Sequence, residues 1–157
     1  MAIDSTNQAW VVISNVEKLL ETEFGGGVIV YISEKREVQN KRSIRLTNLP
    51  KEFISRIASM VTNRHNILIS VEYPIGSNQR LSTEKALQIV ERIERLLTNN
   101  CALTIDSTYI WHDGSSEIDY EPDEEFGEEE IEVETRPEIV ELQNIVWSVT
   151  VSEALPA

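Results

Sequence analysis

The sequence has little of what most active sites are built from. Its 157 residues include a single cysteine, Cys101, and two histidines, His65 and His112. One cysteine cannot form a disulfide within the chain or supply a Cys-based zinc site. Neither histidine lies in a recognisable nucleophile motif, and aromatic residues make up only 6% of the chain, too few for a sugar-binding cleft. We therefore expect no enzyme activity, no cofactor and no metal site.

Long apolar runs are also lacking. No window approaches the roughly 18 consecutive apolar residues that a membrane span requires, so we expect no membrane partner. The three consecutive glycines at 25–27 are not followed by Lys-Ser or Lys-Thr, so they predict a connection and not a phosphate-binding loop. The length of 157 residues fits a single domain covering 1–157.

Charge is unevenly distributed along this acidic chain, whose formal net charge is −13. Residues 117–138, here called the acidic segment, hold twelve acidic residues and one basic residue, a net charge of −11. Residues 35–64, the basic segment, hold eight basic and two acidic residues, a net charge of +6. Both segments fit solvated loops or faces. They also fit a polarised subunit whose segments attract oppositely charged neighbours.

The polarised-subunit interpretation gives a set of candidate interface residues. They are Lys35, Arg36, Lys41, Arg42 and Arg45 in the basic segment, and Glu124, Glu125, Glu128, Glu129 and Glu130 in the acidic segment. The basic segment has no aromatic residue except Phe53, and the chain as a whole is acidic. We therefore expect no sequence-specific nucleic-acid binding.

Hydrophobic periodicity predicts two amphipathic helices, over 6–23 and 82–99. Runs rich in β-branched and aromatic residues predict strands over 28–33, 67–73, 104–111 and 138–151. The three tryptophans, Trp10, Trp111 and Trp147, lie in these predicted elements, so we expect them in the core, with an interface as the alternative.

Three further segments complete the predicted fold. Residues 34–48 are polar and basic and predict a protruding arm or loop. Residues 51–62 fit either a helix or an alternating strand. The strand is favoured, and a turn over 62–66 would then pair it with 67–75. We predict an α+β domain: a mostly antiparallel sheet with two main helices packed on one face, and an acidic insert over 113–137 between the last two strands.

This order of elements is similar to that of a known family. A helix precedes a short strand, a hairpin leads to the strand 67–73, and the polar loop 76–80 leads to the helix 83–97. Strands over 108–111 and 145–151 close the chain. The chain resembles, in architecture over most of its length, the tail terminator and tail-completion proteins of long-tailed bacteriophages. The acidic segment departs from the family pattern.

The resemblance implies a structural virion protein without catalysis. Such a subunit forms a ring, expected to be a hexamer, that caps the tail tube, ends its growth and joins the tail to the head. Its partners would be further copies of itself, the tail tube protein and a neck or head-completion protein. It would be assembled in the host cytoplasm and found in the tail-neck region of the virion. A ring needs two complementary surfaces on each subunit, which the basic and acidic segments would supply.

Two alternatives remain open. The chain fits a head-completion or neck connector protein, whose partner would be a portal or connector ring. It also fits an intracellular binding module whose acidic segment docks on a basic protein. The first alternative differs from a tail terminator in its partner, and the second in needing no self-assembly.

Overall fold

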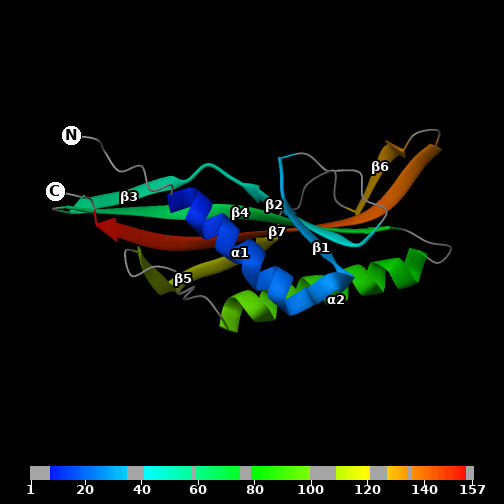
Figure 1. Ribbon diagram of the computed structural model, residues 1–157, viewed down its shortest axis with the longest axis horizontal. Helices are drawn as coiled ribbons and strands as arrows, with labels where there is room; N and C mark the ends of the chain where they lie inside the picture. Colours follow the sequence, from blue (N-terminus) through cyan, green and yellow to red (C-terminus); the bar gives the residue numbers. More distant parts are fainter. Residues whose placement is uncertain are drawn as a thin grey trace.

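The computed structural model shows an α+β domain in which two helices cover one face of a mixed, mostly antiparallel sheet (Figure 1). The structure describes residues 8–34, 41–57, 59–74, 79–99, 109–120, 127–133 and 136–154. Its elements are α1 (Gln8–Phe24), the 3-10 turn η1 (Gly25–Gly27), β1 (Ile29–Ile32), β2 (Ser43–Asn48), β3 (Glu52–Ile57), β4 (Met60–Pro74), α2 (Gln79–Asn99), β5 (Tyr109–Tyr120), β6 (Gly127–Val133) and β7 (Arg136–Ala154). The predicted fold class is confirmed.

Two long strands, β4 and β7, form the middle of the sheet. They pair antiparallel over the whole of β4, from Met60 opposite Ala154 to Pro74 opposite Val140. On the other side of β4, β3 pairs with its beginning and β2 with its later part. On the other side of β7, β6 pairs with its beginning and β5 with its later part. The edge strand β1 pairs with β2 in parallel.

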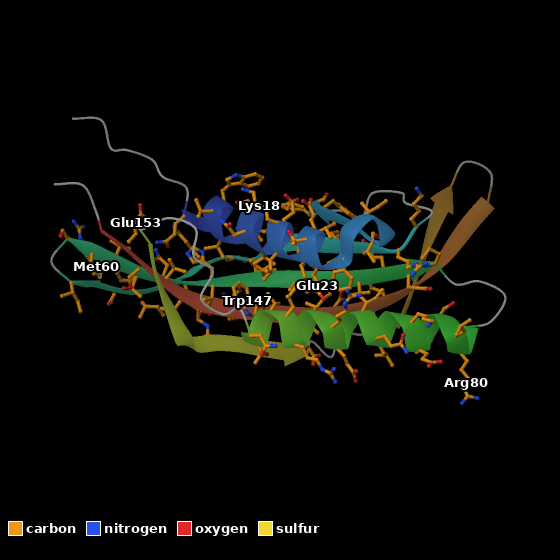
Figure 2. The ribbon with its side chains drawn as sticks, turned by 60° about the horizontal axis from the view of Figure 1, so that its bottom comes forward. Lys18, Glu23, Met60, Arg80, Trp147 and Glu153 are labelled. Atoms are coloured by element: carbon orange, nitrogen blue, oxygen red, sulfur yellow. The ribbon has the colours of Figure 1, made fainter. Side chains whose placement is uncertain are left out.

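The molecule is long, and its two ends are built differently. The β3–β4 hairpin with Met60 lies at one end, and Arg80 at the start of α2 lies at the other (Figure 2). The beginning of β7 and the strand β6 lie at the Arg80 end (Figures 1 and 2). Surfaces at these two ends therefore cannot contact each other within one chain.

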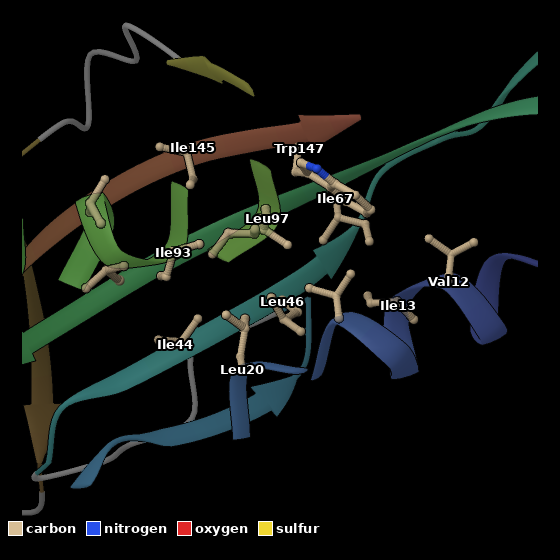
Figure 3. Packing of buried hydrophobic residues seen from close by; sticks show 14 of the residues in the cluster. Val12, Ile13, Leu20, Ile44, Leu46, Ile67, Ile93, Leu97, Ile145 and Trp147 are labelled. Carbon is tan, nitrogen blue, oxygen red and sulfur yellow. The ribbon is translucent and has the colours of Figure 1, made fainter. Parts of the chain in front are cut away.

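The core lies between the helices and the sheet (Figure 3). Helical spacings of three and four place one stripe of each helix in it, and alternate residues of the strands face that stripe. Its members include Val12, Ile13, Val16, Leu20, Ile44, Leu46, Ile67, Ile69, Val71, Val90, Ile93, Leu97, Ile145, Trp147, Val149 and Val151. Burying one such large side chain contributes about 1.5–3 kcal/mol.

The tryptophans do not share one role. Trp147 is fully buried in the core, as the sequence predicts. Trp10 is 56% exposed, so its predicted core position is wrong. It lies two residues after the start of α1, outside the stripe of buried residues that includes Val12 and Val16. The side chain of Trp111 lies outside the described part of the structure.

The predicted arm over 34–48 is wrong for its second half. Residues 43–48 form β2, which lies inside the sheet between β1 and β4. Ile44 and Leu46 are fully buried in the core. They alternate with polar neighbours, which is the pattern of a strand with one buried face. Residues 35–40 lie outside the described part.

The predicted turn over 62–66 is also wrong. These residues continue β4 as strand, and the hairpin reverses instead next to Ser59, between β3 and β4. The strand favoured for 51–62 is confirmed over 52–57, but it pairs with 60–64 and not with 67–75. The polar residues that suggested a turn are tolerated because Asn63 and His65 find a hydrogen-bond partner on α1.

The remaining predicted elements are found with changed limits. Both helices and the strands over 28–33 and 138–151 are confirmed, with β7 extending over 136–154. The strand predicted over 104–111 is observed only from residue 109, and it continues to residue 120; residues 101–108 are not described. Part of the predicted acidic insert therefore belongs to the sheet, as the end of β5 and as β6.

Candidate assembly interface

The described basic candidates lie on or just before β2. Lys41 and Arg42 are exposed and precede the strand, and Arg45 is half-buried within it. The Arg42 guanidinium lies 5.7 Å from the centre of the Tyr73 ring, within the range of a cation–π contact. Lys35 and Arg36 lie outside the described part of the structure.

The acidic candidates that the structure describes lie on β6. The backbone of Glu128, Glu129 and Glu130 is paired with residues 139–141 of β7. Nothing is described of their side chains, or of Glu124 and Glu125.

The strand register places the beginning of β2, with Arg42 before it, at the same end of the sheet as β6. Glu128 is opposite Glu141, and Glu141 is opposite Tyr73. On the other side of β4, Ser43 of β2 is opposite Glu72, the residue before Tyr73. Arg42 comes directly before Ser43, so it lies near Tyr73. Three strand spacings, about 14 Å in total, therefore separate the start of β2 from β6. At this end of the molecule the start of β2 and the strand β6 lie on opposite sides of the β4–β7 pair.

A basic cleft lies beside the start of β2. Its cations are Arg42, Lys85 and Arg92, and its volume is about 320 Å³. Arg92 donates from Nε to Glu23 Oε1 at 3.0 Å and lies over the Phe24 ring at 4.6 Å. One carboxylate thus compensates one of three cations at an exposed site. The cleft suits an acidic group of a partner.

The β3–β4 hairpin exposes large apolar side chains. Phe53 is 67% exposed, Ile54 51%, Ile57 72% and Met60 36%. Ile57 is paired with Met60, and Phe53 with Asn63. Asn63 faces α1, whereas Met60 is an even-numbered residue of β4 and faces the opposite side. The hairpin, called the apolar hairpin below, therefore shows apolar groups on both faces, as interaction sites do.

A groove of about 310 Å³ runs between α1 and the ends of β1 and β2. Apolar atoms of Trp10, Ile13, Ile32 and Leu46 line it, and Glu34 lies at its rim. We call it the α1 groove. Its lining comes from three elements that the core packing already holds in place, so the groove is formed without a partner.

Acidic side chains lie at and beside the α1 groove. Glu34 lines it, and Glu17 lies one helical turn beyond the lining residue Ile13. Glu17 and Glu21 are one helical turn apart, where like charges repel each other. Burial and the nearby Glu21 carboxylate raise the pKa of Glu17. A cation placed beside this pair would relieve the repulsion.

A buried polar cluster ties α1 to the sheet. Asn63 Nδ2 donates to Gln8 Oε1 at 3.0 Å, and His65 Nε2 lies 2.7 Å from the same oxygen. Burial, and to a smaller extent the charge of Lys51, lower the pKa of His65 to about 4. The imidazole is therefore neutral at pH 7. It positions the helix and is not exposed to a substrate.

The sheet face without helices is polar. Tyr31 donates to Glu72 Oε1 at 2.6 Å, and Ser148 donates to Asn66 Oδ1 at 2.6 Å. Thr62 and Ser152 hydroxyls are 2.7 Å apart. These bonds link β1 with β4 and β4 with β7, so this face adds to the cohesion of the sheet.

Comparisons with known proteins give no family for this chain. No family model matches the sequence, and no curated protein matches it. In the described ranges, no group of three or more His, Cys, Asp or Glu side chains is arranged to hold a metal ion. Neither described helix is long and apolar enough to cross a membrane.

Sequence reasoning missed the apolar hairpin and the exposure of Trp10. One signal was present: Phe53 and Ile54 are adjacent, and adjacent residues of a strand point to opposite faces. A core on one face of the sheet can bury only one of two such neighbours. An apolar pair of this kind on an edge strand therefore leaves at least one large apolar side chain outside the core.

Proposed function

We propose that this chain is a structural subunit that assembles with copies of itself into a closed ring. In this proposal the ring acts as the tail terminator proteins do, which the chain resembles in its order of elements. It caps the tube of a bacteriophage tail, ends the growth of the tube and joins it to the head.

The observation that carries the proposal is the apolar hairpin. Four large apolar side chains stand exposed at one end of a domain that has a complete core elsewhere. A domain with a sufficient core gains nothing from such a surface on its own. A subunit that buries it in an assembly gains, for each side chain, the exposed fraction of the about 1.5–3 kcal/mol that full burial contributes, and these fractions are 36–72%.

The charge layout supports the same proposal. The basic cleft and the acidic strand β6 lie at the end of the molecule opposite the hairpin tip. Each subunit thus has contact surfaces at both ends. Ring formation by head-to-tail contacts requires two different surfaces on each copy.

The test is native mass spectrometry of the purified chain across salt and magnesium concentrations, with negative-stain images of the same samples. Closed rings, expected as hexamers, that bind the ends of purified tail tubes support the proposal. Rings that bind a portal ring and not a tube end identify a neck connector instead. Monomers under all conditions, also in the presence of tube ends, contradict self-assembly.

One observation favours a second function. The strand β6 carries three consecutive glutamates in fixed register with β7, so their spacing along the edge of the sheet is set by the fold. An edge of this kind suits a basic protein partner. Glu128→Gln, Glu129→Gln and Glu130→Gln together would abolish binding of that partner while the unfolding temperature stays the same. Intact rings from the same triple variant would assign self-assembly to other residues.

A further inference from the structure

We propose that the apolar hairpin of one copy docks in the α1 groove of the next copy. The inference rests on the proposed function, because it names the contact that would hold neighbouring subunits of the ring together. The occupant of the groove is a second molecule of this chain.

The hairpin cannot fill the groove of its own chain. β4 is one uninterrupted strand of 15 residues, paired with β7 from end to end. The Leu49 N–H donates to the Asn66 carbonyl at 2.9 Å, which fixes the end of β2 next to the groove lining. From Asn66 to Met60 the strand extends for about 20 Å. The tip is therefore held away from the groove, and the occupant has to come from another molecule.

The two surfaces match in polarity. One face of the hairpin offers Ile57 and Met60, and the groove is lined mostly by apolar atoms, with Trp10 among the lining residues. A volume of about 310 Å³ lies at the lower limit of small-molecule sites. The groove thus suits a few inserted side chains of a protein. Trp is also the residue type most enriched at energetically dominant contact positions.

The two surfaces match in charge as well. Residues 51–64 carry Lys51, Arg56 and Arg64 against Glu52, a net charge of +2. The α1 groove has Glu34 in its lining, and Glu17 lies one helical turn beyond the lining residue Ile13. Arg56 is exposed on the hairpin, and Glu17 and Glu21 form the repelling pair on α1. A docked hairpin would bring a cation to that pair.

Charge also distinguishes the α1 groove from the other exposed apolar surface. On α2, Leu81 is 49% exposed and Leu87 46% exposed. The charged residues within one helical turn of them are Arg80, Glu84, Lys85 and Glu91, a net charge of zero. This surface offers a basic hairpin no net attraction, whereas Glu34 lines the α1 groove.

The contact is of the head-to-tail type. Hairpin and groove are different surfaces of one subunit, so each copy donates a hairpin to one neighbour and accepts one from the other. Such contacts close into a ring when the rotation between neighbours permits, and otherwise continue as a filament.

The first experiment mixes two variants. Ile57→Ser removes the main apolar group of the hairpin, and Trp10→Ser removes that of the groove; both side chains are exposed, so both variants should fold. Each variant alone should associate about tenfold more weakly than the wild type. Their mixture should form dimers and no rings, because only one intact pair of surfaces remains. Leu87→Ser, at an apolar residue that is 46% exposed on α2, is the control and should form rings normally.

A charge exchange tests the orientation of the contact. Arg56→Glu should weaken association, and Glu17→Arg with Glu21→Arg should weaken it as well. All three changes in one chain should restore it. Rings of wild-type stability from Ile57→Ser, Trp10→Ser and Arg56→Glu would overturn the docking while the proposed function stands.

Cross-linking separates the docking from ring formation. Ile57→Cys in one copy and Trp10→Cys in another, both with Cys101→Ser, should form a mixed disulfide under mild oxidation. The matched pair Leu87→Cys and Trp10→Cys should not. A specific cross-link without any rings would support the docking and contradict the ring. Rings in which the first pair does not cross-link would overturn the docking.

Discussion

Gln8 and His65 are joined across 57 positions of sequence by a 2.7 Å contact between Gln8 Oε1 and His65 Nε2. The amide oxygen can only accept a hydrogen bond, so Nε2 carries the proton of the neutral ring. Gln8 also accepts from Asn63 and donates to Glu153 Oε2 at 3.4 Å. One side chain at the start of α1 thus binds both central strands, β4 and β7.

This contact predicts acid sensitivity of the fold. Burial lowers the pKa of His65 to about 4 in the folded chain, from the ordinary value of 6.5. Between these values the unfolded chain binds a proton that the folded chain does not. The stabilisation is therefore full above pH 6.5 and is lost as the pH falls towards 4. From pH 7 to pH 5 the free energy of unfolding should fall by about 2 kcal/mol through this group.

Urea unfolding at the two pH values measures this effect. His65→Gln is the control, because it keeps a donor towards Gln8 and does not titrate. The wild type should lose about 2 kcal/mol more than the variant between pH 7 and pH 5. Equal losses would show that His65 does not titrate differently in the two states.

A second prediction concerns the position of β2. Ile44→Ala removes a fully buried side chain next to the helices and should lower the free energy of unfolding by about 2–5 kcal/mol. Phe53→Ala, at a position 67% exposed, is the comparison and should change it by less than about 1 kcal/mol. Thermal or urea unfolding of both variants is the measurement. A small effect of Ile44→Ala would mean that 43–48 is not part of the sheet.

A third prediction concerns the sheet face without helices. Tyr31→Phe removes the hydroxyl that donates at 2.6 Å to the fully buried Glu72. A buried carboxylate that loses a donor should cost about 1–3 kcal/mol of folding free energy. Thr22→Val removes an exposed hydroxyl that bonds only its own helix and should cost far less. Comparable unfolding midpoints of the two variants would contradict a stabilising role for the Tyr31 bond.

The fourth prediction concerns the charged end of the molecule. Lys41→Glu with Arg42→Glu reverses two exposed cations, one of which lines the basic cleft. Self-association should weaken, and the weakening should be largest at low salt, because salt screens exposed charges beyond about 10 Å at 0.1 M. Sedimentation velocity from low to moderate salt measures the self-association of the variant and of the wild type. Unchanged association at every salt concentration would exclude an electrostatic contact through these residues.

The helices and the core could be predicted from local sequence because they follow a period. Val12, Val16 and Leu20 recur at helical spacing, and so do Val90, Ile93 and Leu97. The structure confirms these residues as core. The interior strand β2 could not be recognised from the sequence, because Ile44 and Leu46 are the only apolar residues among the basic and polar residues of 39–48.

The prediction of a turn over 62–66 is wrong for a different reason. Asn63 and His65 are acceptable in a buried strand only because Gln8 reaches them from α1, and no local pattern contains that distant partner. The exposure of Ile57 likewise depends on where the helices lie on the sheet. The charged candidates were visible in the sequence, but their position at one end of the sheet depends on the register of β4, β7 and β6.

The β4–β7 pairing has a consequence for the timing of synthesis. Its partners are separated by 66 to 94 residues, from Pro74 with Val140 to Met60 with Ala154. At roughly 5–20 residues per second, a ribosome needs several seconds between making β4 and making its partner. During that interval β4 has one open edge and the core lacks the Trp147 strand. Contacts of such high sequence separation also form slowly. A complete subunit is therefore available for any assembly only after translation has passed β7.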